Sequence, residues 1–227
     1  MMPPLDYLFT IPEDICERVY ERDGYKCWFC CSDDELRVVH HIDPFANNQF
    51  SMFLREGTIP HSVDNPFHPD NLFLLCRDCY FGYDHRFPEW LLIPDKETIQ
   101  KFIDHEKMDY ENRYLVSQTS HPPPRSLPFI DRTKILYHPL MITHDELHCY
   151  NSICDERWPK NWRGEPTVII HRAARCGLFH SSPIRPISFQ MGRYRKWQTG
   201  VPEIFRVLVG ELINLWARQP PKIGKRV

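Results

Sequence analysis

The residues best suited to chemistry in this sequence are two Cys-x-x-Cys pairs with two adjacent histidines between them. In chain order they are Cys27 and Cys30, His40 and His41, and Cys76 and Cys79. A two-residue spacer lets both thiolates of a pair reach one zinc ion from a tight turn, and two pairs complete a closed four-sulfur site. We therefore predict that the four cysteines hold a structural zinc ion. The alternative is that Cys30 or Cys31 is simply a small buried hydrophobic residue.

The two histidines come at the end of a strand that we expect over residues 35–42, just before Asp43-Pro44. Adjacent side chains on a strand point to opposite faces, so the two imidazoles should have different roles. One can ligate a metal while the other stays free as a base, because a histidine near its reference pKa can take a proton from water at neutral pH. The alternative for either histidine is an ordinary half-buried residue.

Three runs, RDGYKCWFC, RVVHHIDP and DNLFLLCRDCY, resemble the HNH endonucleases, which have the ββα-metal fold. The resemblance covers residues 13–93 and is greatest to the fungal branch of these domains. It implies an α+β protein with a ββα-metal core and a structural zinc site, followed by a helical or irregular C-terminal extension. It also implies metal-dependent hydrolysis of phosphodiester bonds, with DNA as the expected nucleic acid.

The resemblance assigns roles residue by residue. His41 matches the general base, and Asn71 matches the asparagine that holds the base-bearing loop in place. His40 matches a ligand of the single catalytic divalent ion, which would be Mg²⁺, Mn²⁺, Zn²⁺ or Ni²⁺. The four cysteines match the structural zinc cysteines that many members contain.

One position departs from the family pattern. The last motif letter should be His or Asn directly after Cys79, and here it is Tyr80, whose neutral phenol is a poor ligand for a divalent metal. Asp84 lies one helical turn further on, where the family often has a second ligand, and His85 is the fallback. The alternative to an endonuclease is therefore a catalytically impaired, zinc-stabilised HNH-like module that only binds nucleic acid or a protein partner.

Charge is distributed unevenly along the chain. Residues 1–159 have 15 basic and 27 acidic residues, a net charge of −12, whereas residues 160–227 have 13 and 3, a net charge of +10. This division predicts that the C-terminal third meets a polyanion, with Arg193, Arg195 and Lys196 as candidate nucleic-acid contacts. The alternative is that the basic third folds onto the acidic body and neutralises it.

The resemblance implies an HNH-like nuclease domain over residues 1–116, and composition predicts a proline-rich linker over 117–128 and a basic extension over 129–227. Within the first part we expect helices over 12–23, 78–85 and 95–116, strands over 71–75 and 90–93, and a long irregular insertion over 45–70. Within the extension we expect helices over 143–154 and 202–219 and a strand over 167–171. The linker and the last helix are the candidate surfaces for a protein partner.

The composition argues against a disordered chain, a collagen-like chain and a coiled coil. Hydrophobic residues are 42% and charged residues 26% of the 227 residues, values that are typical of a globular chain. The sequence contains no run of about 18 uncharged apolar residues, so we expect no membrane span. The odd number of cysteines, 9, and the lack of a secretory signal predict an intracellular protein. For His171, Cys176 and His180 we expect a structural role.

Overall fold

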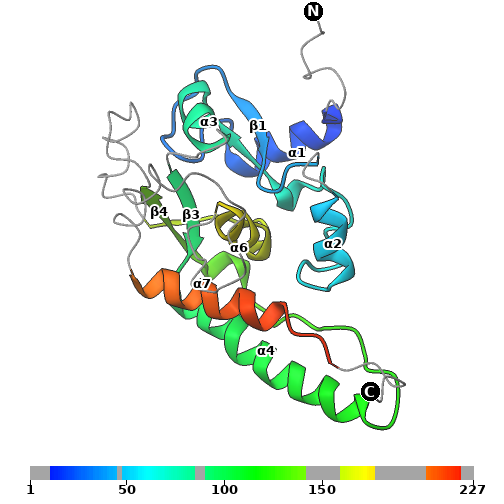
Figure 1. The fold of residues 1–227 in the computed structure, drawn as a ribbon. Coiled ribbons are helices and arrows are strands. Elements are labelled where there is room, and N and C mark those ends of the chain that lie inside the picture. The colour runs from blue at the N-terminus through cyan, green and yellow to red at the C-terminus, as the bar shows by residue number, and fades with distance from the viewer. Residues whose placement is uncertain (1–10, 45–47, 85–89, 142–158, 177–202, 221–227) are drawn as a thin grey trace, which may run out of the picture.

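The computed structural model describes residues 11–44, 48–84, 90–141, 159–176 and 203–220. Its helices are α1 (Glu13–Asp23), α2 (Gln49–Arg55), α3 (Arg77–Asp84), α4 (Lys96–Ser117), α6 (Pro166–Arg175) and α7 (Glu203–Trp216), with 3-10 turns η2 (Pro69–Asn71) and η3 (Arg132–Lys134). Its strands are β1 (Arg37–His40), β2 (Leu72–Leu75), β3 (Trp90–Pro94), β4 (Leu136–Met141) and β5 (Lys160–Asn161). The protein is thus a mixed α/β structure with two small sheets (Figure 1).

The first sheet is the antiparallel pair β1–β2, in which His40 lies opposite Leu72, and α3 follows β2 directly. Helix α1 packs against β2 and is joined to it through polar side chains as well as apolar ones. The Arg22 guanidinium donates to the carbonyl oxygen of Leu72 at 2.7 Å, and a carboxylate oxygen of Asp23 accepts from the backbone N–H of Leu74 at 2.9 Å. These bonds fix the helix across the end of the strand.

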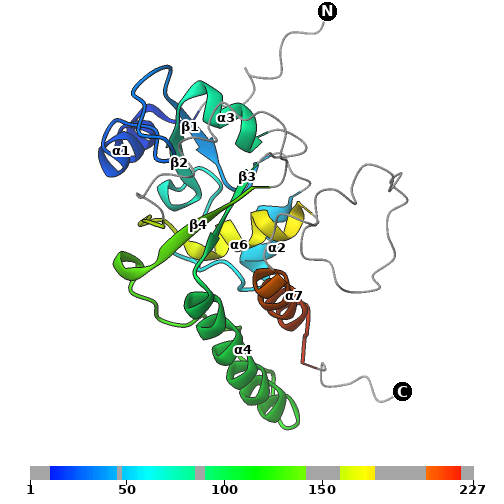
Figure 2. The same ribbon diagram turned by 90° about the vertical axis from the view of Figure 1, so that its left-hand side faces the viewer.

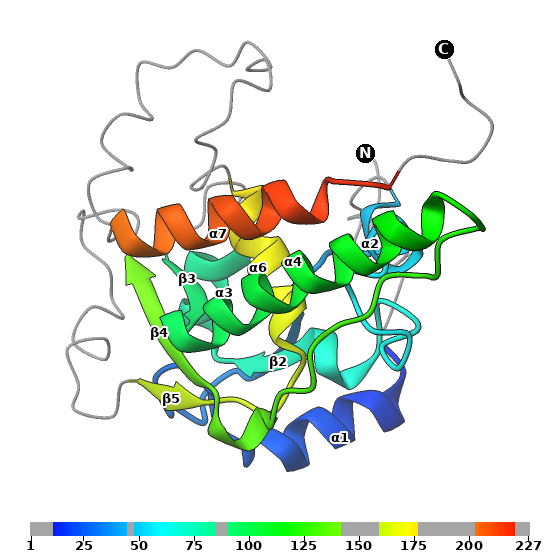
Figure 3. The same cartoon turned by 90° about the horizontal axis from the view of Figure 1, so that it is seen from below.

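The second sheet has the order β3–β4–β5 and is antiparallel throughout. Strand β3 precedes the predicted linker, while β4 and β5 follow it. Helix α6 packs against β3, and α4 and α7 lie side by side beyond α6 (Figure 3). The second half of α4 extends away from the two sheets (Figure 2).

The hydrophobic cores include residues from both sides of the linker. In one core, Phe29 and Phe73 from the N-terminal part pack in the same cluster as Tyr137 and Trp162. In the second core, α4 and β3 pack against α6 and α7. The segment 129–227, where it is described, is therefore packed into the same cores as residues 11–116.

The proline-rich segment is itself anchored by Arg125. Its guanidinium donates to the carbonyl oxygens of Glu56 at 2.7 Å and Trp216 at 2.8 Å, and it lies 3.0 Å from a carboxylate oxygen of Glu106. Glu106 is buried and also pairs with Arg113 at 2.7 Å, so the buried carboxylate has two cationic partners. Through these contacts Arg125 joins the proline-rich segment to α4, to the end of α2 and to the end of α7.

The predicted helices 12–23, 78–85, 95–116 and 202–219 are present as α1, α3, α4 and α7. The predicted strand over 167–171 is wrong, because this segment belongs to helix α6. The β-branched run Val168-Ile169-Ile170 is typical of a strand by residue type, but Pro166 opens a helix and the Glu165 carboxylate accepts from the N–H of Thr167 at 3.2 Å. The first half of the helix, residues 166–170, is mostly apolar and β-branched, and its basic residues, Arg172 and Arg175, come only in the last turn, beyond the predicted strand.

The insertion 45–70 is less irregular than predicted. It contains α2, which buries Phe50 and Phe53, and it ends in η2. Strands β4 and β5 had no predicted counterpart, and the predicted helix over 143–154 lies outside the described residues. In the part of the chain that the structure describes, no helix is both long and apolar enough to cross a bilayer.

His171 of α6 has the structural role expected from the sequence. Its ring is buried between Phe53 and Trp216, with centroids 3.7 and 4.8 Å away, and Nε2 lies 2.9 Å from the hydroxyl of Thr58. Burial lowers the pKa of His171 to about 3 because the charged form loses its hydration.

This depressed pKa predicts acid sensitivity. Above pH about 6.5 the imidazole is neutral in both the folded and unfolded chains, and below it only the unfolded chain takes up the proton. Lowering the pH from 7 to 5 should therefore remove about 2 kcal/mol of the free energy of unfolding through His171 alone. Urea unfolding of wild type and His171→Phe at both pH values checks this. The variant should lose less stability on acidification, whereas the exposed control His121→Asn should match wild type; equal pH slopes for all three would contradict the assignment.

Candidate metal centre and histidine site

The sulfur atoms of Cys27, Cys30, Cys76 and Cys79 all lie within 4.8 Å of one another. The Cys30 and Cys76 sulfurs are 3.5 Å apart, close to the separation of about 3.8 Å that a tetrahedral zinc site with Zn–S bonds of about 2.3 Å requires. Four soft thiolates, three of them buried, are the donor set that zinc prefers in structural sites. The cluster therefore fits a structural metal ion such as zinc, and the predicted convergence of the two pairs is confirmed.

Local backbone geometry positions the first pair. The N–H of Cys31 donates to the carbonyl of Cys27 at 2.8 Å, and the N–H of Cys30 points to the Cys27 sulfur at 3.4 Å. Cys31 takes a positive φ of 67°, which turns the chain away after the second sulfur. We refer to residues 27–31 as the cysteine knuckle. The N–H of Trp28 donates to the carbonyl of Leu74 at 2.8 Å and so joins this knuckle to β2.

The second pair sits where β2 ends and α3 begins, and the N–H of Tyr80 closes the first helical turn on the carbonyl of Cys76 at 2.9 Å. Thiolates are favoured there by the positive end of the helix dipole. Hydrogen bonding from Cys27 and Cys79 lowers the pKa of Cys30, and hydrogen bonding from Cys27 lowers the pKa of Cys76. Hydrogen bonding with Cys30 and Cys76 raises the pKa of Cys27, so a metal ion that binds the four sulfurs must displace the proton of this thiol.

Asn71 holds the chain that follows β1. Its Oδ1 accepts from the N–H of Ile42 at 3.0 Å, and its Nδ2 donates to the carbonyls of Ile42 at 3.0 Å and Pro66 at 2.8 Å. The N–H of His41 in turn donates to the carbonyl of Asn71 at 2.9 Å. The buried amide of Asn71 thus determines where the His41 backbone lies relative to β2.

The His41 ring is fully buried, with 0% of its surface exposed. It stacks on Phe73 with centroids 4.2 Å apart, and the ring of Trp162 meets it edge-on at 4.6 Å. Nδ1 lies 2.5 Å from the hydroxyl of Tyr83, while Nε2 has no hydrogen-bond partner among the residues that the structure describes. Burial, together with Arg172 and Arg22, holds the pKa of His41 well below its ordinary value, so the imidazole is neutral. Solvent water does not reach the ring in this conformation.

Among the described residues, the two predicted ligands of a catalytic metal, His40 and Asp84, belong to no group of three or more donors. His40 is half-buried beside Phe67, and burial lowers its pKa to about 4. Asp84 lies on the surface, with a carboxylate oxygen 3.8 Å from the guanidinium of Arg172. Within the described ranges, the cysteine cluster is the only set of three or more His, Cys, Asp or Glu side chains close enough to share an ion. The carboxylate of Asp84 therefore already has a cationic partner in Arg172.

Residues from the C-terminal segment complete the histidine site, and the sequence carried no local signal for them. Arg172 donates to the carbonyl oxygens of His41, at 3.2 Å, and Tyr83, and its guanidinium lies 4.0 Å from the centroid of the Tyr83 ring. Trp162 covers the imidazole, as described above. The predicted nucleic-acid contacts Arg193, Arg195 and Lys196 lie outside the described residues.

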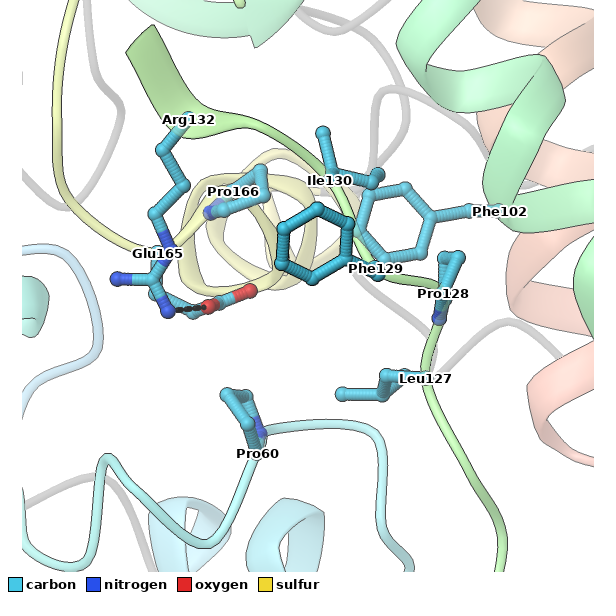
Figure 4. Close-up of a pocket in the computed structure, with 9 residues that line it drawn as sticks. All are labelled: Pro60, Phe102, Leu127, Pro128, Phe129, Ile130, Arg132, Glu165 and Pro166. Carbon is cyan, nitrogen blue, oxygen red and sulfur yellow. Dashed lines mark hydrogen bonds and ion pairs between the residues drawn. The ribbon is translucent and has the colours of Figure 1, made fainter.

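A separate pocket lies between the proline-rich segment and α6 and has a volume of about 340 Å³ (Figure 4). Its walls include Leu127, Ile130 and Phe102, and Phe129 beside it is 97% exposed. At its edge Arg132 and Glu165 form an ion pair, in which a guanidinium nitrogen lies 2.6 Å from a carboxylate oxygen. The pocket therefore offers an apolar surface, with its charges already paired.

No protein-family model, curated protein or solved structure matches this chain.

The cysteine cluster predicts a metal requirement for folding. Zinc analysis of the purified protein should give one ion per chain, and chelation should lower the melting temperature by about 10 °C, which corresponds to about 3 kcal/mol in a chain of this size. Cys79→Ser should lose the ion and show the same low melting temperature without chelator. Cys16→Ser, on α1 and outside the cluster, is the matched control and should retain zinc. A metal-free wild type of unchanged stability would contradict the prediction.

Proposed function

We propose that the protein is a zinc-stabilised, HNH-like module that binds nucleic acid and whose phosphodiester-cleaving centre is impaired. The observation that carries the HNH part is the clamp of Asn71 on both backbone groups of Ile42, next to His41. This clamp agrees with the role that the resemblance assigns to Asn71. The chain order β1, β2, α3, with the cysteine cluster at the β2–α3 junction, supports a ββα-metal core.

Three features support impaired catalysis. The candidate base, His41, is closed to solvent by aromatic rings. Asp84 is paired with Arg172, and the ligand position after Cys79 is occupied by Tyr80. General-base catalysis needs a water within hydrogen-bond reach of the base, and metal catalysis needs an open coordination site built from several donors.

Nucleic acid is the partner that the charge distribution favours. The first 159 residues have a net charge of −12, so they repel phosphates, while residues 160–227 have a net charge of +10. The basic residues of this third can neutralise backbone phosphates and release counterions, which is the main source of affinity in nonspecific nucleic-acid binding.

An active endonuclease is the second candidate, and one observation favours it. Tyr83 lies at Nδ1 of His41, and no described residue bonds to Nε2, which is the arrangement that a base accepting a proton from water needs. In that case one divalent ion, Mg²⁺, Mn²⁺, Zn²⁺ or Ni²⁺, would stabilise the charge on the leaving oxygen. The aromatic cover would have to move before water could reach Nε2.

Plasmid cleavage separates these candidates. We expect supercoiled DNA incubated with wild type and each of the four metals to be nicked no faster than with His41→Ala, because the base is covered and the ligand set is incomplete. The measurement is the loss of supercoiled plasmid on a gel over time. Metal-dependent nicking by wild type that falls by 100-fold or more, to about the background rate, in His41→Ala would establish the endonuclease instead.

A salt titration tests the assigned nucleic-acid surface in the full chain. Replacing Arg193, Arg195 and Lys196 by alanine should weaken DNA binding and reduce the slope of log affinity against log salt by about 2 to 3, because three phosphate contacts are lost. The control replaces three exposed lysines of the body, Lys96, Lys101 and Lys134, and should leave the slope nearly unchanged. Fluorescence anisotropy of a labelled duplex provides both values. Equal slopes for the two triple variants would contradict the proposal.

A further inference from the structure

Lys160 of β5 contacts the cysteine knuckle, although the two are about 130 positions apart in the sequence. Its ammonium group donates to the carbonyl oxygens of Trp28 at 3.1 Å and Phe29 at 2.7 Å. It also lies 3.6 Å from the sulfur of Cys31. Trp28 and Phe29 are the two residues between the first pair of cysteines, so Lys160 binds the part of the backbone that sets the spacing of their sulfurs.

Charge makes this contact relevant to the metal. A zinc ion with four thiolates has a formal net charge of about −2, and groups outside the ligand shell that donate hydrogen bonds or carry positive charge stabilise such centres. Lysine has three N–H donors, and two carbonyls and a sulfur accept from Lys160 here. The ammonium therefore holds the backbone between Cys27 and Cys30 and places a positive charge beside the knuckle.

The residues that follow Lys160 lead directly to the histidine site. The carbonyl of Asn161 accepts from the indole N–H of Trp28 at 3.3 Å, and Trp162 then covers His41. The indole of Trp162 folds back over Gly164 so closely that a Cβ at Gly164 would lie 2.1 Å from it. The chain from the knuckle contact to the cover is thus short and closely packed.

We infer that Lys160 is a positioning residue of the metal centre, and that through it metal binding is coupled to the docking of β5 and α6 over His41. The inference depends on the cysteine cluster binding zinc and is independent of the nucleic-acid proposal. Coupling of this kind is reciprocal, so a change that loosens the docked segment lowers zinc affinity by the same factor by which zinc favours docking.

Competition with a chromophoric chelator measures the zinc affinity of the full-length protein. Lys160→Met should bind zinc about 10- to 100-fold more weakly than wild type, and Lys160→Arg should recover part of the loss. The matched control is Lys134→Met, at an exposed ion pair with Asp131, and it should bind zinc as wild type does. A purely structural role would destabilise the metal-loaded and metal-free protein equally and leave the affinity unchanged.

Hydrogen exchange tests the coupling in the wild-type chain and does not depend on any variant folding. Removing zinc should raise amide exchange in residues 160–175, far from the cysteines in sequence, as well as in the knuckle. Gly164→Ala, which displaces Trp162, should lower zinc affinity several-fold. Unchanged affinity in Lys160→Met overturns the positioning role, and exchange in 160–175 that is insensitive to zinc overturns the coupling. A wild type that binds no zinc would instead refute the metal centre itself.

Discussion

The convergence of four sulfur atoms is the constraint on which the rest of the structure depends. It joins the knuckle after α1 to the junction of β2 and α3, two segments that are separated by the whole insertion. A sheet of only two strands has marginal stability in isolation, so the cysteine cluster at the end of the β1–β2 pair is expected to stabilise it. The position of His41 after β1, and of Asn71 before β2, follows from that pair.

Burial then decides the chemistry of the histidine site. Aromatic rings from both halves of the chain pack around His41 and remove the water that a general base would use. The same desolvation keeps the imidazole neutral, and the neighbouring guanidinium groups of Arg172 and Arg22 lower its pKa further. A residue type suited to catalysis is thus held in surroundings typical of a core residue, where its Nε2 has no hydrogen-bond partner in the described part of the chain.

Residues from the C-terminal half of the chain complete this site. Lys160 binds the knuckle, Trp162 covers the histidine, and Arg172 joins the carbonyls of His41 and Tyr83. The net positive charge of residues 160–227 also balances the acidic first 159 residues. The same basic third of the chain is therefore available both for packing within the protein and for attracting a polyanion. The described part of this third, up to α6 and in α7, is used for packing.

Local patterns in the sequence determined the two Cys-x-x-Cys pairs and the helices α1, α4 and α7, because each depends on spacing within one short segment. The role expected of Asn71 came only from the family resemblance. Only the tertiary structure decided that 167–171 is helical, that His41 is buried, and that Lys160 and Arg172 reach the two sites. Those outcomes depend on contacts between residues up to about 130 positions apart, which no local period or motif encodes. Whether a β-branched run forms a strand or a buried helix, and whether a histidine is exposed or part of a core, depends on which residues pack against it.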